Sequence, residues 1–306
     1  MAAQAWTPPP TSFAGLGRGD FGRGAGRPRQ RVLVLRHGSR PTSTADPPLD
    51  SRGERQAQEV AQYFARPEVR APLQRTPITA IYCSPFKRAL QTAGPVAAAL
   101  GLPIRVEWGF CELLADGWLH SGDPLPKVRR SSGQLAQLVS PGRLDSSYDS
   151  AVMPEYPDLY GRLYGHGSAR DLGKRDKALD RHRRAVEAAL RSCGGSGSLL
   201  IVGHGSTHDF VSDALCGEQW QHMEQWHTPH CVDHCAVTEI VEQDYPKGWH
   251  LSSFGGLPWK SDDRLQDTLE AQIHANWAVA FAENAASEAR VAASSAEKEA
   301  PDKRPF

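Results

Sequence analysis

The sequence has no run of apolar residues long enough to cross a membrane, because polar or charged residues interrupt every apolar run before the roughly 18 residues that a span requires. It also has no surplus of either charge, since 35 lysines and arginines balance 35 aspartates and glutamates. Proteins that bind nucleic acids or anionic membranes through bulk electrostatics carry a basic surplus. We therefore expect neither as a partner, although a local basic patch is not excluded.

Cysteine is scarce as well, with 6 residues in 306. The first residues lack the basic start and the continuous apolar stretch of a secretory signal. We therefore expect reduced thiols and a cytoplasmic location rather than a disulfide framework. The alternative is an organelle transit peptide within residues 1–30, where Asp20 is the only acidic residue.

Composition divides the chain into zones. Apolar residues make up 40% and charged residues 23%, which is typical of a globular protein with a sizeable core. Residues 1–30, rich in Gly, Ala, Pro and Arg, are predicted to be a flexible tail, and residues 31–260 to form one domain. A C-terminal helix is predicted over residues 261–290, with a disordered tail over 291–306.

Within the domain, short apolar runs alternate with segments of helical periodicity. A nearly all-apolar run such as RVLVL is typical of a strand buried on both faces. Strands that alternate with helices predict an α/β fold of three layers, α/β/α, around a mostly parallel sheet. The expected strands are 31–35, 78–82, 104–106, 199–202 and 236–241, and the expected helices are 53–65, 88–100, 174–193 and one that ends near residue 215.

Residues 113–170 break this alternation. They are irregular and rich in Pro, Ser and Tyr. An insertion of this length in an α/β domain usually forms a lid or a substrate-facing loop. We expect substrate selectivity to lie in this insertion.

Chemically active side chains follow the predicted strands, at the sheet edge where ligands bind in open α/β folds. A guanidinium matches phosphate oxygens, a histidine among several of them can attack phosphorus, and a carboxyl group can protonate the leaving oxygen. This combination predicts hydrolysis of a phosphomonoester through a phosphohistidine, without a metal or other cofactor. The residues are Arg36, His37 and Arg40 after the first strand, Arg88 after the second, Glu112 after the third and His204 after the fourth.

Five segments in order, VLVLRHG, PLDSRGERQA, YCSPFKRALQTA, CELL and LLIVGHG, resemble the histidine phosphatase superfamily, branch 1, also called phosphoglycerate mutase-like. The resemblance runs from about residue 31 to 260 and implies the phosphoglycerate mutase-like fold. Its RHGxR form is similar to that of the ecdysteroid-phosphate phosphatases and of the T-cell ubiquitin-ligand phosphatase domains. It implies His37 as nucleophile, Glu112 as acid/base, Arg36, Arg40 and Arg88 as phosphate ligands, and His204 as both catalytic and phosphate-binding.

Two other activities of the superfamily are weighed against hydrolysis in branch 1. A mutase-type phosphotransferase carries an Asn after the RHG motif, which this chain lacks. The acid-phosphatase branch has RHGxRxP and a late His-Asp pair, whereas here Pro41 comes one place early and Gly205 follows His204. A third alternative is a catalytically silent phosphate-binding scaffold. Asp50 stands where the family pattern has Thr or Ser, and is expected to cap a helix.

The sequence leaves two assignments open. Glu107 lies five residues before Glu112 and is the other candidate for the acid/base. A cluster of His and Cys in HTPHCVDHC has zinc-ligand chemistry, but alternating side chains on a strand would direct half of them away from one centre, so we expect no metal site. The cluster comprises His227, His230, Cys231, His234 and Cys235.

The expected partner is a small phosphorylated substrate or a phosphoprotein. Neither the physiological substrate nor the oligomeric state follows from the sequence.

Overall fold

The computed structural model describes residues 28–41, 46–114, 123–139, 143–158, 177–195, 197–217, 232–244 and 247–260. The predicted C-terminal helix and tail lie outside these residues, as do most of the N-terminal tail and the side chains of His227, His230 and Cys231. Among the described helices, none has the length and apolarity that a membrane span needs.

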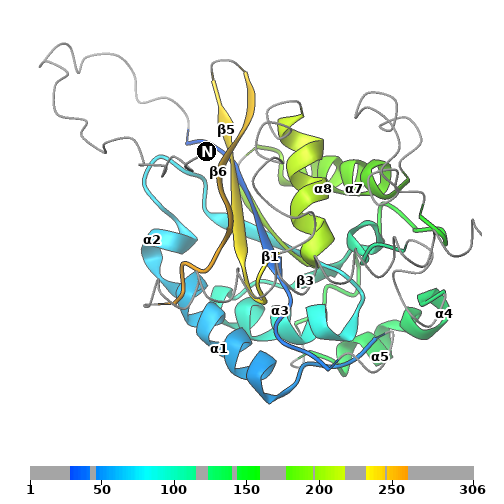
Figure 1. Cartoon of the computed structure of the whole chain (residues 1–306). Helices are drawn as coiled ribbons and strands as arrows, with labels where there is room; N and C mark the ends of the chain where they lie inside the picture. The colour runs from blue at the N-terminus through cyan, green and yellow to red at the C-terminus, as the bar shows by residue number, and fades with distance from the viewer. Residues whose placement is uncertain are drawn as a thin grey trace, which may run out of the picture.

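A six-stranded sheet of order β3-β2-β4-β1-β5-β6 forms the middle of the domain (Figure 1). The first four strands pair in parallel, and the last two join as antiparallel strands. The prediction of an α/β fold with a mostly parallel sheet is therefore confirmed. The strands are β1 (Arg31–Arg36), β2 (Ile78–Cys83), β3 (Ile104–Val106), β4 (Ser198–Gly203), β5 (Val237–Gln243) and β6 (Gly248–Gly256).

Helices cover both faces of this sheet (Figure 1). Alternate side chains of β1 point to opposite faces, as the period of two in a strand requires. Leu33 and Leu35 pack in the core with α1 and α3, while Val32 and Val34 pack in the core with α7 and α8. The long helices are α1 (Ser51–Ala65), α3 (Lys87–Leu100), α7 (Lys177–Cys193) and α8 (Gly205–Cys216), and the short ones are α2 (Pro67–Arg70), α4 (Leu125–Val128), α5 (Ser132–Ala136) and the 3₁₀ helix η1 (Trp108–Phe110).

The cap predicted at Asp50 is confirmed. Its carboxylate accepts a hydrogen bond from the backbone N–H of Gly53 at 2.7 Å, and α1 begins at Ser51, two residues before the expected start. Gly53 also has a steric role, because a Cβ at this position would come within 2.1 Å of the carbonyl oxygen of Ser39. The N-terminus of α1 is thus packed directly against the loop that follows β1.

Two expectations need correction. The edge strand β6 was not predicted, because its residues are exposed or half-buried and rich in Gly and Ser, which gives no strand-like pattern. The insertion 113–170 is not wholly irregular, since its described part contains α4 and α5. Apolar side chains of α4 pack with Phe86, Cys111 and Leu114, which joins the insertion to the loops at the carboxyl ends of β2 and β3.

Candidate active site

The carboxyl ends of the parallel strands bring four of the candidate residues together. His37 directly follows β1, and His204 directly follows β4, which pairs with β1 so that Arg36 lies opposite Gly203. Arg88 is the second residue of α3, after β2. Glu112 follows η1, after β3. The ligand atoms of His37, Glu112 and His204 lie within 4.8 Å of one another.

His37 is fully buried, and its hydrogen bonding defines its tautomer. Nδ1 lies 2.8 Å from the carbonyl oxygen of Gly38, which only accepts, so Nδ1 carries the proton. The lone pair is then on Nε2, which has no hydrogen-bond partner among the described residues. Burial, together with the guanidinium groups of Arg88 and Arg36, holds the pKa of His37 well below its usual value. The imidazole is therefore neutral and able to act as a nucleophile.

Arg88, Glu112 and His204 form a buried network behind His37. Nη2 of Arg88 donates to Oε2 of Glu112 at 3.3 Å and lies 3.2 Å from Nδ1 of His204. Oγ of Ser84 lies 2.8 Å from Nε2 of His204, and Oγ of Ser206 donates to Oε1 of Glu112 at 2.9 Å. Burial lowers the pKa of His204 to about 4. Burial alone would raise the pKa of Glu112, but His204 and Arg88 hold it well below its usual value.

The guanidinium groups leave donors available for an anion. Arg88 is 1% exposed, and neither its Nε nor its Nη1 has a hydrogen-bond partner in the described part of the chain. Nε of Arg40 is likewise buried without a described partner. Burial first, and the charge of Arg40 in addition, lower the pKa of Arg88. Nη1 of Arg36 donates to the carbonyl of Val232. Buried donors without partners are costly unless a ligand satisfies them, so this arrangement suits a phosphoryl group.

Glu107 has a different environment from Glu112. It is fully buried, and its two carboxylate oxygens accept hydrogen bonds from five donors of the described chain. A carboxylate saturated in this way anchors the backbone and has no free lone pair directed at a ligand. The donors are the N–H of Gly109, Ala151 and Val152 and the hydroxyls of Tyr148 and Ser150, at 2.6–3.2 Å.

His234 lies beside His37, whereas the sequence marks it only as a candidate metal ligand. Its ring lies 5.5 Å from the ring of His37, and burial together with Arg36 and Arg40 holds its pKa well below the usual value. The neighbouring Cys235 packs instead in the hydrophobic core. The two side chains thus serve different parts of the structure. The His-rich loop before β5 marks His234 in the sequence. That His234 lies against His37 could be seen only in the structure.

Arg181, on α7, was also missed. Its guanidinium donates to the carbonyls of Gly109, Cys111 and Glu112 at 2.8, 2.9 and 2.8 Å, and to Asp158 at 2.7 Å. These bonds fix the backbone that carries Glu112. In a sequence, an arginine on a helix is expected at the surface, so nothing there indicated that Arg181 is buried against the backbone around Glu112.

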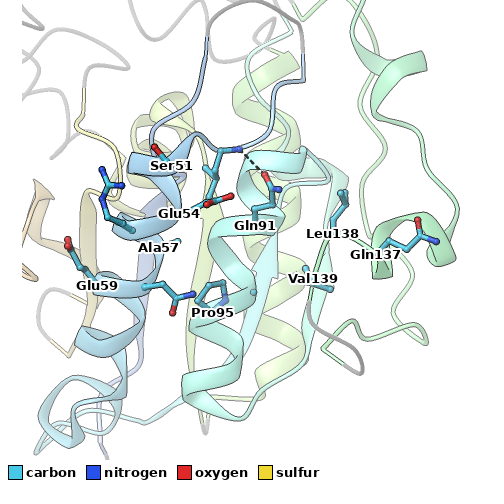
Figure 2. A pocket seen from close by; sticks show the side chains of 13 residues that line it. Ser51, Glu54, Ala57, Glu59, Gln91, Pro95, Gln137, Leu138 and Val139 are labelled. Atoms are coloured by element: carbon cyan, nitrogen blue, oxygen red, sulfur yellow. Dashed lines mark hydrogen bonds between the residues drawn. The ribbon is translucent and has the colours of Figure 1, made fainter.

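A separate cavity of about 830 Å³ lies between α1, α3 and the segment after α5 (Figure 2). Gln91 accepts a hydrogen bond there from the backbone N–H of Leu49 at 2.8 Å, and the lining is a mixture of acidic, amide and apolar side chains with one arginine, Arg55. None of the candidate catalytic residues lines this cavity. The candidate catalytic residues therefore lie at the sheet edge and not in this cavity.

The chain is similar to solved structures of phosphatases. Ecdysone phosphate phosphatase from Bombyx mori, in complex with tungstate, is 19% identical, covers 77% of this chain and 96% of its own, and has a TM-score of 0.53. A mycobacterial glucosyl-3-phosphoglycerate phosphatase with inorganic phosphate is 20% identical, with coverages of 76% and 100% and a TM-score of 0.47.

A curated relative is the transcription factor tau 55 kDa subunit of Saccharomyces cerevisiae, 31% identical over 111 residues. The matched stretch is 36% of this chain and only 22% of the yeast protein. Residues 32–125, which include His37, Arg88 and Glu112, match the family model of the histidine phosphatase superfamily (branch 1). This match places residues 32–125, which form part of the α/β fold described above, in the histidine phosphatase superfamily, branch 1.

Proposed function

We propose that this protein hydrolyses phosphomonoesters through a phosphohistidine on His37, without a metal ion. The observation that carries the proposal is the unpartnered Nε2 of a neutral, buried His37 beside the unused donors of Arg88. The match of residues 32–125 to branch 1 and a fold similar to that of a phosphatase support phosphatase-type activity. A small phosphorylated molecule or a phosphoprotein is the proposed substrate.

In the proposed reaction, Arg36, Arg40, Arg88 and His204 hold the phosphoryl oxygens. Charge-assisted hydrogen bonds strengthen as negative charge develops in the transition state. Nε2 of His37 forms a bond to phosphorus as the ester P–O bond breaks, and Glu112 gives a proton to the departing oxygen. Glu112 then takes a proton from the water that cleaves the phosphohistidine, which releases phosphate and restores His37.

The acid role of Glu112 requires its proton, whereas His204 and Arg88 keep its pKa low in the free protein. A phosphoryl dianion bound to Arg88 opposes a second negative charge nearby and raises the pKa of the carboxyl group. Substrate binding itself thus favours the protonated form. Glu107, saturated by its five hydrogen bonds, is not proposed for this role.

The test is release of inorganic phosphate from a panel of phosphorylated metabolites, nucleotides, peptides and p-nitrophenyl phosphate. We expect turnover of p-nitrophenyl phosphate in the presence of EDTA, and a preference within the panel that identifies the substrate class. Absence of turnover across the panel contradicts the proposal. Transfer of the phosphoryl group to a second sugar hydroxyl, without phosphate release, would indicate the mutase-type alternative.

The pH profile should show no loss of the nucleophile in mildly acidic solution. Because the pKa of His37 is held well below 6.5, lowering the pH from 7.5 to 5.5 leaves the imidazole neutral. We expect kcat/KM for p-nitrophenyl phosphate, corrected for ionisation of the substrate, to change less than threefold over this range. A fall of tenfold or more with an apparent pKa near 6.5 would show that His37 titrates normally, contrary to the structure.

The match of residues 32–125 to branch 1 weighs against the acid-phosphatase alternative. The one nearby His-Asp pair, His208-Asp209 on α8, is buried, and Nδ1 of His208 lies 2.7 Å from Oγ1 of Thr238, on β5.

A silent phosphate-binding scaffold is a second candidate, favoured by the curated relative, which is a subunit of a transcription factor. Calorimetry separates the two functions. A scaffold binds vanadate or phosphate with no turnover of any substrate, whereas an enzyme shows both.

A further inference from the structure

Arg88 faces two buried carboxylates. Its Nη2 donates to Glu112 at 3.3 Å, and its Nη1 lies 3.9 Å from Oδ1 of Asp46. The side chains of Arg88 and Asp46 are 1% and 5% exposed, so water screens this contact only weakly. Two full negative charges beside one guanidinium would leave little attraction for a phosphoryl dianion.

A second arginine pairs with Asp46. Arg130, between α4 and α5, donates from Nη2 to Oδ2 of Asp46. Its Nη1 lies 3.3 Å from the carbonyls of Pro85 and Val128, and its side chain is 11% exposed. Arg130 is therefore held firmly against the loop that leads from β2 to Arg88.

The two oxygens of Asp46 have different partners. Oδ1 accepts from the backbone N–H of Lys87 at 2.9 Å, and Oδ2 accepts from Arg130. The guanidinium of Arg130 thus supplies the charge that neutralises this carboxylate, while Arg88 keeps Nη1 without a hydrogen bond.

We propose that Arg130 is a positioning residue that keeps Asp46 from neutralising Arg88, and thereby sets the affinity of the pocket for a phosphoryl group. This inference rests on the proposed phosphate pocket, but not on turnover. Burial lowers the pKa of Arg88 to about 10, and among the neighbouring charges Glu112 and Asp46 act to raise it, so the field of Asp46 does reach Arg88. Arg130 lies beyond the matched residues 32–125, in the insertion. Through the charge of Arg130, the insertion contributes to phosphate binding.

The experiment measures the Kd of orthovanadate and of inorganic phosphate by calorimetry. In Arg130→Met, we expect Kd to rise at least tenfold, because Asp46 loses its partner and turns to Arg88. In the double variant Asp46→Asn/Arg130→Met, the competing charge is gone while an amide oxygen still accepts from Lys87. Kd should then return to within threefold of the wild-type value.

Arg129→Met is the matched control, since it removes the same charge from the exposed neighbouring residue. Its Kd should stay within twofold of wild type. An equal loss in Arg129→Met would mean that bulk charge alone acts. A double variant as weak as Arg130→Met would mean that Arg130 contacts the anion or holds the fold. Either outcome overturns the inference.

The double variant also serves if Arg130→Met does not fold, because it carries no unpaired buried carboxylate. If that variant folds and binds as wild type, charge compensation is supported, and if it folds and binds weakly, the inference is wrong. Wild-type protein that binds vanadate without turnover contradicts the proposed hydrolysis and leaves this inference standing. Wild-type protein that binds neither anion contradicts both.

Discussion

His37→Ala is expected to abolish hydrolysis of p-nitrophenyl phosphate, with kcat/KM reduced about 10⁴-fold or more, as is usual when a covalent nucleophile is removed. Nε2 of His37 is the atom that has an available lone pair and no hydrogen-bond partner in the described structure. Without it, the guanidinium groups can still bind the phosphoryl group but cannot accept it covalently. Phosphate release and the thermal unfolding curve are measured together.

The fold should persist in this variant, because the hydrogen bond that the ring makes within the described chain is local, from Nδ1 to the carbonyl oxygen of the adjacent Gly38. His234→Ala is the matched control, since its ring lies beside that of His37. We expect that control to retain turnover with an altered KM. Acid-labile, base-stable labelling of wild type by a ³²P-substrate, absent in His37→Ala, would identify the phosphohistidine. Retention of more than a few per cent of activity in His37→Ala would eliminate the mechanism.

Glu112→Gln should slow poor leaving groups far more than good ones. An alkyl phosphate needs a proton on its departing oxygen, so its kcat should fall about 10²–10³-fold, the usual contribution of a general acid. A p-nitrophenolate leaves without that proton, and its first step should slow less than tenfold. Single-turnover kinetics on both substrates give the ratio.

Glu107→Gln is the control for this prediction. Its amide N–H₂ would face buried donors that now bond to a carboxylate, such as the hydroxyl of Tyr148. We expect the free energy of unfolding to fall by about 3 kcal/mol, the scale for buried groups left without partners. The ratio of rates for the two leaving groups should not change. If Glu107→Gln changes that ratio and Glu112→Gln does not, the acid has been assigned to the wrong residue.

The strands of the parallel sheet could be read from the sequence because burial on both faces requires unbroken apolar runs. The run SLLIVG of β4 is buried at every position, and its predicted range was within one residue of the observed one at each end. The edge strand β6 has one face or both in contact with solvent, so no such pattern marks it. Helices α4 and α5, of 4 and 5 residues, are too short to show a helical period.

Candidate site residues could be found where the rule for open α/β sheets applies, directly after a buried strand. His37 and His204 lie there, next to β1 and β4. Asp46, Arg130 and Arg181 could not be found in this way. They lie in a loop, in the insertion and on a helix. The residues next to them in the sequence do not indicate that these side chains contact the site.

The environments of Glu107 and Glu112 illustrate which features of the site the sequence does not reveal. Five residues apart, the two are nearly equivalent in sequence. Glu107 is saturated by donors from residues 148–152, while Glu112 meets Arg88 and His204. Only chain folding brings those distant groups to one carboxylate or the other.

The layer architecture, the family resemblance and the residue types at the sheet edge could be predicted from the sequence alone, because each depends on short-range burial patterns and motifs. The tertiary structure decided which carboxylate is free to act, which nitrogen of His37 has the lone pair and how Asp46 is neutralised. The pairing of Asp46 and the saturation of Glu107 depend on hydrogen bonds between segments 40 or more residues apart, which form only once the core has packed, whereas the tautomer of His37 is set by the adjacent Gly38. Although the net charge of the chain is balanced, these ion pairs leave a cationic pocket at one edge of the sheet.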